Sequence, residues 1–395
     1  RLKVLMISNW LPPDHGGGGL QMMRLARRLK ERGVDCTILA GTKRRELVGY
    51  SEDPIPTVRF RVYSLGKVRN LIFLVSTFFW ILFHGRGFDI LHMTCMNWSG
   101  LAGILIMKAT GRRAIMKFSL KGVDDPFSVK NSQLGTLKYA IFKRLDRYIS
   151  TSRILADEIR EKLPDFAGNV VFLPNGADTD MFRPAPTDEK LDLRRRLDLP
   201  ADRTIHCYTG VVNQRKGIDI LFRGWAGWAE RCGGDPGLLL MVGPMGVGTD
   251  PFATVEYEQG LLGFLEENGL ADSVKFVGKT DRVADYLMAS DIFLFPSRRE
   301  GLPNALIEAQ AAGLPCIASD IEGCRDVISH GENGLLYKVD KHAELAAHIE
   351  KLHADPALRG KLSAAAREAA EKNFSINRVL DEYLKIYEEL APGKL

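Results

Sequence analysis

The spacing of apolar and polar residues over the first forty positions predicts a strand, a helix and a second strand. Lys3–Ser8 is an apolar run typical of a buried strand, and Leu20–Glu31 places apolar residues at helical spacing. Another strand-like run follows at Val34–Leu39. Because a glycine-rich turn separates the first strand from the helix, the pattern indicates a βαβ unit and therefore a parallel sheet.

The same alternation continues through both halves of the chain. Further strands are predicted over residues 89–93, 114–118, 148–151, 169–174, 204–210, 237–242, 273–277, 291–295, 315–318 and 334–337. Helices are predicted over 217–228, 256–268, 283–289 and 305–312, and 341–389 is almost entirely helical in period. Since 395 residues exceed what one core usually holds, the sequence predicts an α/β protein with two parallel-sheet domains.

The domain boundaries follow from composition. Residues 176–203 are rich in proline and charge, so we expect a linker that contains a short polar helix at 188–197. The first domain then spans 1–175 and the second 204–375. In parallel α/β sheets ligands bind outside the carboxyl ends of the strands, so we expect a cleft between the two sheets.

Charge is distributed unevenly along the chain. Residues 1–180 contain 28 Lys and Arg against 16 Asp and Glu, a balance of +12, whereas the remainder has 26 against 33. A basic half suggests an anionic partner, such as a membrane surface or an acidic acceptor, although a solvated basic surface is the simpler alternative. The six cysteines show no paired short spacing and are typical of a reduced, cytoplasmic protein.

One apolar segment bears on the membrane question. Residues 71–83 are apolar, but a membrane span needs about 20 residues. Two interpretations remain open, which are a helix lying in the lipid interface and a helix buried against the sheet.

Two glutamates stand eight positions apart at a predicted strand-to-helix junction. Glu300 precedes Pro303, which fits the first turn of a helix, and Glu308 falls in the second turn. A helix N-terminus between them favours a phosphate group. Carboxylates at both ends of a phosphate site suit a nucleotide sugar, which has hydroxyls on its sugar and on its ribose.

These residues belong to a longer pattern. Three segments resemble motifs of the retaining glycosyltransferases of family 4 and occur in the same order along the chain. They are Leu173–Phe182, the block from Pro296 to Pro315, and Glu332–Leu336. This resemblance, which runs through nearly the whole chain, implies the GT-B fold, with two Rossmann-like domains facing across a cleft. It also implies that the C-terminal helix, 376–395, packs back onto the first domain.

The resemblance assigns roles around the two glutamates. Glu308 would accept hydrogen bonds from the donor ribose, and Glu300 would hold hydroxyls of the donor sugar and take part in catalysis. The backbone of Gly301, Leu302, Pro303, Asn304 and Ala305 would approach the sugar and diphosphate and, except at Pro303, would offer N–H groups to them. Backbone contacts near Lys279 would help to select the base.

A second loop supplies positive charge. In Gly210–Gly217, Lys216 can neutralise the leaving diphosphate as the glycosidic bond breaks, which lowers the barrier. Where the family often has an arginine after the first glycine, Gly210, this chain has Val211. Arg215 could supply the missing guanidinium or could point into solvent.

The remaining candidates lie in the first domain. Gly17 and Gly18 belong to a glycine loop that resembles the one the family closes over the donor diphosphate, and backbone without side chains permits close approach. Many family members have a His-Gly pair where this chain has Lys121-Gly122, so Lys121 could instead hold an anionic acceptor or the phosphate. His15 is a further candidate for that contact, and both His15 and His92 are candidates to replace the missing histidine, with a structural or solvent-facing role as the alternative for each.

The resemblance therefore implies a retaining glycosyltransferase that moves a sugar from a nucleoside-diphosphate sugar to a hydroxyl acceptor in cell-surface glycan or glycolipid synthesis. UDP is favoured over GDP, the nucleotide sugar is a co-substrate, and we expect neither a cofactor nor a metal. Expected partners are a glycan or lipid-linked acceptor and no nucleic acid, with a peripheral contact at the inner face of the plasma membrane as an open alternative. A nucleotide-sugar epimerase and a non-catalytic nucleotide-sugar-binding subunit are the alternative functions.

Overall fold

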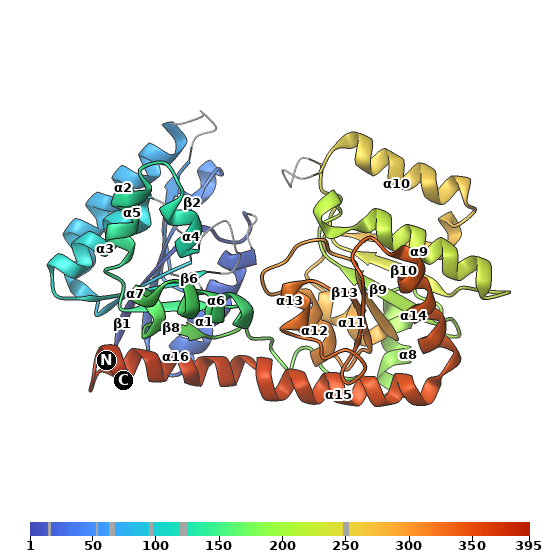
Figure 1. Cartoon of the computed structure of the whole chain (residues 1–395). Helices are drawn as coiled ribbons and strands as arrows, with labels where there is room; N and C mark the ends of the chain where they lie inside the picture. The colour runs from blue at the N-terminus through green and yellow to red at the C-terminus, as the bar shows by residue number, and fades with distance from the viewer. Residues whose placement is uncertain (15–16, 53, 63–67, 95–97, 119–124, 248–252) are drawn as a thin grey trace. The chain divides into compact units, whose positions relative to one another are not determined.

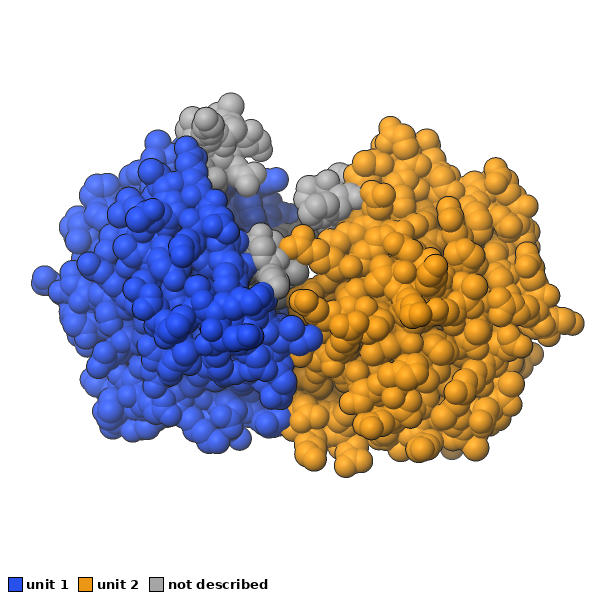
Figure 2. Space-filling view, viewed as in Figure 1, with its two compact units in different colours: residues 1–175, 377–395 blue, residues 176–376 orange. Residues whose placement is uncertain are grey.

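The computed structural model describes residues 1–14, 17–52, 54–62, 68–94, 98–118, 125–247 and 253–395. These residues form two compact units (Figures 1 and 2). Unit 1 comprises residues 1–175 and 377–395, and unit 2 comprises residues 176–376. Each unit is an α/β domain built on its own sheet, so the prediction of two parallel-sheet domains is confirmed.

Unit 1 contains an eight-stranded sheet in the order β3-β4-β2-β1-β5-β6-β7-β8. The strands are β1 (Lys3–Trp10), β2 (Asp35–Thr42), β3 (Gly49–Ser51), β4 (Thr57–Arg61), β5 (Ile90–Met93), β6 (Arg113–Phe118), β7 (Arg147–Ser150) and β8 (Val170–Phe172). All neighbours pair in parallel except β3, which is antiparallel to β4. The sequence reasoning missed β3 and β4, two short strands at the edge of the sheet.

Helices cover both faces of this sheet. They are α1 (Gly17–Glu31), α2 (Val68–His84), α3 (Trp98–Ala109), α4 (Pro126–Lys130), α5 (Gly135–Phe142), α6 (Arg153–Lys162), α7 (Pro164–Ala167) and α16 (Ile376–Leu390). Along β1, Val4 and Met6 pack with α1 and α16, whereas Leu5 and Ile7 pack on the opposite face with α2 and α3. The alternation of side chains along a strand therefore places one core on each side of the sheet.

Unit 2 contains a six-stranded parallel sheet in the order β11-β10-β9-β12-β13-β14. Its strands are β9 (Ile205–Thr209), β10 (Leu238–Val242), β11 (Val274–Gly278), β12 (Ile292–Phe295), β13 (Cys316–Ser319) and β14 (Leu335–Tyr337). Its helices are α8 (Thr187–Arg196), α9 (Ile218–Arg231), α10 (Val255–Glu267), α11 (Val283–Ala289), α12 (Asn304–Ala311), α13 (Glu322–Arg325), α14 (His342–Ala354) and α15 (Pro356–Phe374).

The stretch 176–203 is not a free linker. Phe182, Leu193 and Leu197 are buried in a core of unit 2, and the guanidinium of Arg194 donates to the carbonyl of Ala289 at 3.0 Å. The expected polar helix is α8, and its apolar residues pack beside α11. Because these side chains complete the core, the segment belongs to the second domain.

The apolar segment 71–83 forms most of α2. Phe73, Thr77 and Ile81 are buried, but the opposite face of the helix is exposed. The interpretation of this segment as a helix buried against the sheet therefore holds for only one face of α2. Within the described parts of the chain, no helix combines the length and apolarity needed to cross a membrane.

Candidate functional site

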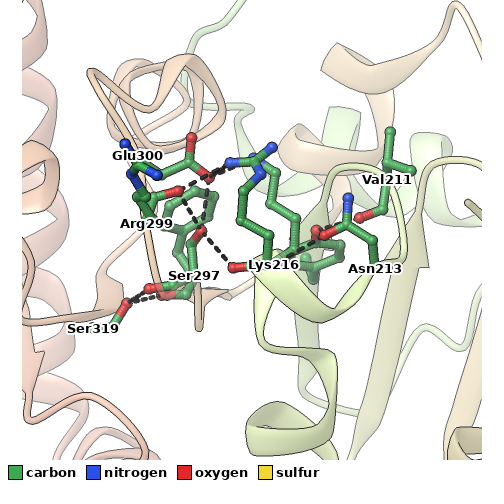
Figure 3. Close-up of polar contacts among 10 residues, drawn as sticks. Val211, Asn213, Lys216, Ser297, Arg299, Glu300 and Ser319 are labelled. Atoms are coloured by element: carbon green, nitrogen blue, oxygen red, sulfur yellow. Dashed lines mark hydrogen bonds and ion pairs between the residues drawn. The ribbon is translucent and has the colours of Figure 1, made fainter. Parts of the chain in front are cut away.

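Two loops of unit 2 meet at the carboxyl edge of its sheet. Strands β9 and β12 are parallel neighbours, so the loops that follow them leave the sheet side by side. The loop after β9 contains a short 3-10 turn, η3 (Gln214–Lys216), and the loop after β12 runs from Pro296 to Pro303. This strand order brings the predicted Lys216 and Glu300 together (Figure 3).

The carboxylate of Glu300 is the centre of the cluster. Lys216 Nζ donates to its Oε1 at 2.6 Å, Ser297 Oγ donates to the same atom at 2.7 Å, and Arg215 Nη1 does so at 3.1 Å. The second carboxylate oxygen, Oε2, accepts no hydrogen bond from the described residues. Two cations around one carboxylate leave one net positive charge, and the open oxygen remains able to accept further hydrogen bonds.

These contacts also set the charge state of Glu300. Burial acts to raise the pKa of its carboxyl, but the positive charges of Lys216 and Arg215 and the hydrogen bonds from Lys216 and Ser297 outweigh that effect. The pKa of Glu300 therefore lies below its ordinary value of 4.5. At neutral pH this side chain is a carboxylate, which acts as an acceptor and not as a proton donor.

The local backbone explains why Lys216 reaches this position. Asn213 accepts a hydrogen bond from the backbone N–H of Lys216 at 2.9 Å, which closes the 3-10 turn. Gly217 has φ +68°, and a Cβ at this residue would lie 2.1 Å from the carbonyl oxygen of Pro296. Glycine is therefore required here because the two loops approach too closely for any side chain.

Arg298 joins the two loops by hydrogen bonds from its side chain and its backbone. Its Nη1 donates to the carbonyl of Gln214 at 2.7 Å and to Asp219 Oδ1 at 2.8 Å, while Nη2 donates to Asp219 Oδ2 at 2.7 Å. Its Nε donates to Asp340 at 3.0 Å, and its backbone N–H donates to the carbonyl of Arg215 at 2.9 Å. A planar guanidinium suits such a bidentate arrangement. Arg298 thus fixes the position of the Arg215–Lys216 turn relative to Glu300.

The sequence reasoning left Arg215 with two alternatives, and the geometry excludes only the one in which the side chain points into solvent. Its guanidinium donates to the carbonyl of Arg299 at 2.9 Å as well as to Glu300, so the side chain points into the cluster. Sequence reasoning assigned no role to Ser297, Asn213 and Arg298. Ser297 could have been noticed because it follows the buried strand β12 directly, whereas the contacts of Arg298 depend on the packing of four separate segments.

Helix α12 carries the second glutamate. The helix begins at Asn304, so Pro303 immediately precedes the first turn instead of lying within it. Pro303 has no N–H, so the first backbone N–H groups of the helix belong to Asn304 and Ala305, which follow the loop residues Gly301 and Leu302. Glu308 is buried in the second turn of the helix.

Two other predicted donor residues directly follow strands of the same sheet. Gly210 follows β9 with φ +151°, and its N–H donates to the carbonyl of Val242 at 2.9 Å. Lys279 follows β11 and is exposed, but β11 is separated from β9 by β10. No hydrogen bond joins Lys279 to the Glu300 cluster among the described residues.

The candidates of unit 1 occupy a separate part of the chain. Gly17 and Gly18 form the start of α1, and a Cβ at Gly18 would meet no atom within 4 Å. At Gly19, in contrast, a Cβ would lie 1.8 Å from the carbonyl oxygen of Trp10, so close packing is required there. His15 and Lys121 lie outside the described residues.

His92 is a core residue. Its side chain is 1% exposed, and its Nδ1 lies 2.7 Å from the hydroxyl of Tyr387 on α16. Burial, assisted by the charge of Lys117, lowers the pKa of His92 to about 3. The ring therefore stays neutral and holds α16, and it does not replace the missing histidine. The described residues contain no cluster of three His, Cys, Asp or Glu side chains that could hold a metal.

Comparisons with known families agree with this arrangement of two domains. Residues 189–369 match the family described as Glycosyl transferases group 1, and residues 16–176 match the Glycosyl transferase 4-like domain.

Curated relatives are similar over most of their length. The D-inositol 3-phosphate glycosyltransferase of Nocardiopsis dassonvillei is 27% identical over 402 residues, which covers 95% of this chain and 90% of the relative. The lipopolysaccharide core biosynthesis mannosyltransferase LpsB of Rhizobium meliloti is 28% identical and covers 75% of this chain and 80% of the relative.

Solved structures share the fold at low sequence identity. Sucrose-phosphate synthase from Thermosynechococcus elongatus aligns with a TM-score of 0.82 at 24% identity, covering 99% of each chain. Anabaena HepE in complex with UDP and glucose aligns with a TM-score of 0.77 at 18% identity, covering 99% of this chain and 100% of HepE.

Proposed function

The chain belongs to the glycosyltransferases of the group 1 family with the GT-B fold, and we propose on this premise that its donor is a nucleoside-diphosphate sugar. UDP is the favoured nucleotide and GDP the second. The sugar is transferred to a hydroxyl group with retention of anomeric configuration. The donor acts as a co-substrate, and the reaction proposed here uses neither a cofactor nor a metal.

The convergence of Lys216 and Arg215 on Glu300 is the observation that supports this proposal. The two cations provide charge for a diphosphate, and the open Oε2 of Glu300 can accept hydrogen bonds from sugar hydroxyls. The N-terminus of α12 lies directly after this loop, where its N–H groups favour an anion. Glu308, in the second turn of this helix, would accept hydrogen bonds from the ribose hydroxyls.

The proposed reaction is a departure of the diphosphate from the same face that the acceptor attacks. The bond between the anomeric carbon and the diphosphate oxygen breaks while a bond forms from the acceptor hydroxyl oxygen to that carbon. The departing oxygen takes the hydroxyl proton, so no protein nucleophile is needed. Lys216 and Arg215 stabilise the negative charge that grows on the diphosphate, and they act most strongly in the transition state.

The similar proteins bear on the substrates. HepE is described with UDP and glucose, which supports UDP as the nucleotide. The named relatives act on an inositol phosphate and in lipopolysaccharide core synthesis. We propose a phosphate-bearing or lipid-linked glycan acceptor for this chain, in keeping with its basic first half, and a role in cell-surface glycan or glycolipid synthesis on the cytoplasmic side.

A thermal-shift screen tests the nucleotide. The free energy of unfolding rises by about 2.7 kcal/mol when the ligand is at about 100 times its Kd, so UDP, GDP, ADP and CDP sugars can be ranked. Glu308→Gln should weaken UDP binding about tenfold, because a charge-assisted hydrogen bond is lost, whereas Glu267→Gln on the exposed face of α10 should not. Equal stabilisation by every sugar, or by none, would contradict the assignment.

Product analysis separates the alternatives. NMR of the product with an accepted donor and acceptor should show the anomeric configuration of the donor. An epimer formed from the donor without any acceptor would indicate an isomerase instead. Donor binding without turnover over a broad acceptor panel would favour a non-catalytic subunit.

A further inference from the structure

The outward face of α2 is an unusual surface for a water-exposed helix. Six of its large apolar side chains are exposed, and Phe83 and Phe79 reach 74% and 50% exposure. The six residues, which we call the α2 face, are Leu71, Val75, Phe78, Phe79, Leu82 and Phe83. Isolated exposed apolar residues are normal, but a contiguous group on one element marks an interaction surface.

The spacing of the α2 face makes it continuous. At about 100° per residue, the six positions fall within an arc of roughly 140° on one side of the helix. Phe73, Thr77 and Ile81 point the other way and are buried in unit 1. No residue from 70 to 85 carries a charge on Asp, Glu, Lys or Arg. The exposed side of α2 is therefore an uninterrupted apolar stripe, while the opposite side of the helix is held in the core of unit 1.

The helices around this stripe have charge of one sign. Helix α2 packs against α3, and α3 packs against α5 (Figure 1). These three helices, α4 and the short turn η2 (Gly85–Gly87) carry five basic residues and no acidic residue: Arg69, Arg86, Lys108, Lys130 and Lys138. Lys108 is paired with Asp146 at 2.9 Å, but Lys130 and Lys138 form no ion pair with the described residues.

Aromatic and apolar side chains continue on the neighbouring helices. Trp98, at the start of α3, is partly exposed, and the ammonium of Lys138 lies 5.2 Å from its ring centroid. Leu137 on α5 is also exposed. Aromatic rings with nearby lysines suit the boundary between lipid headgroups and acyl chains.

From these observations we propose that the α2 face docks the protein on an anionic lipid surface, with α2 lying in the plane of the interface. An amphipathic helix with an apolar face and basic surroundings binds membranes in this way, through apolar burial and attraction to acidic headgroups. A helix of 17 residues is about 26 Å long, and it is anchored along its buried side, so it lies on the bilayer and does not cross it. The proposal does not depend on the identity of the donor or the acceptor.

Charge favours lipid over a second copy of the chain. A two-fold contact would bring the same surface of each copy together, so the basic residues around α2 would face one another without acidic partners. An anionic bilayer supplies the opposite charge over a wide area. A protein partner would need both an acidic rim and an apolar groove to match.

Vesicle co-sedimentation of the full chain tests the proposal. The protein should bind vesicles of equal phosphatidylcholine and phosphatidylglycerol, bind pure phosphatidylcholine much more weakly, and lose binding in 0.5 M salt, since salt screens the attraction. Phe79→Ser with Phe83→Ser should weaken binding at least about tenfold, because two large apolar side chains are lost. Val255→Ser with Leu262→Ser, two exposed apolar residues of α10 in unit 2, should change nothing.

A second measurement uses the unaltered protein. Hydrogen exchange with and without the anionic vesicles should show protection of peptides from 68–84 and none of peptides from 255–267. The proposal is wrong if the wild-type protein does not sediment with anionic vesicles, or if the Phe79 and Phe83 variant binds them equally well. It is also wrong if light scattering shows that the wild-type protein is a dimer and that this variant is a monomer, since the α2 face would then be a contact between copies.

Discussion

Replacing Lys216 by alanine should abolish most of the turnover and leave the fold in place. The ammonium group lies 2.6 Å from Glu300 Oε1, at the point where we place the leaving diphosphate. Two different roles predict a loss of activity. Lys216 could stabilise charge on the diphosphate, or it could only neutralise Glu300 and keep that side chain in place.

The structure gives the expected magnitudes. Removing one preorganised donor to a developing charge lowers kcat by about 10²–10³, or about 2.7–4 kcal/mol. The side chains of Lys216 and Glu300 are 16% and 11% exposed, but Glu300 keeps Arg215 and Ser297 as partners. We therefore expect a loss of only about 1–2 kcal/mol in the free energy of unfolding. In a domain of this size that lowers Tm by about 2–4 °C for each kcal/mol.

A double-mutant cycle separates the two roles. Initial rates with saturating acceptor should be measured for Lys216→Ala, Glu300→Gln and the double variant, with Lys351→Ala on exposed α14 as the control. If Lys216 acts on the diphosphate, its removal should still reduce kcat at least about tenfold when residue 300 is already glutamine.

The opposite result would refute the reasoning. If Lys216→Ala has no effect on kcat in the Glu300→Gln background, the lysine only balances the charge of Glu300. If Lys216→Ala alone retains near-normal turnover, Lys216 has no catalytic role in this chain.

Three further predictions follow from the same structure. Arg298→Lys should lower kcat/KM about tenfold and Arg298→Ala about a hundredfold, because neither side chain can hold Asp219 and the Gln214 carbonyl together and a misplaced Lys216 reduces the rate. If the steady-state kinetics of Arg298→Ala equal those of wild type, Arg298 does not have this positioning role. Because the pKa of Glu300 is lowered in the folded protein, its ion pairs contribute stability above pH 4.5, and this stability is lost as pH falls through the lowered folded value. The free energy of unfolding in urea should therefore fall more steeply below pH 4.5 for wild type than for Glu300→Gln. Parallel pH curves for the two proteins would contradict the assignment. A chain ending at Phe374 lacks α16, whose buried side chains complete one core of unit 1. This truncated chain should therefore lose the near-ultraviolet circular dichroism of unit 1. Full activity of the truncated chain would show that α16 is dispensable.

Most of the secondary structure could be predicted from local pattern. The sequence reasoning placed β12 and α12 to within one residue because a short apolar run, a proline and a helix-forming stretch follow one another there. It failed at β3 and β4, two short strands whose side chains are mostly exposed or half-buried, so that they lack a distinct apolar pattern. It also assigned 176–203 to a linker, because the few apolar residues of α8 have no helical period strong enough to reveal their burial.

The sequence by itself determined the alternation of strands and helices, the glutamates at the junction of β12 and α12, and a lysine loop after β9. Only the tertiary structure decided that Lys216 and Glu300, 84 residues apart, share a hydrogen bond and that Arg298 holds their loops together. It also decided which face of the largely apolar α2 is buried and which is exposed. The physical reason is that periodicity reports only on neighbours along the chain, whereas these contacts depend on the order of strands in a sheet and on which surfaces the remaining elements leave uncovered.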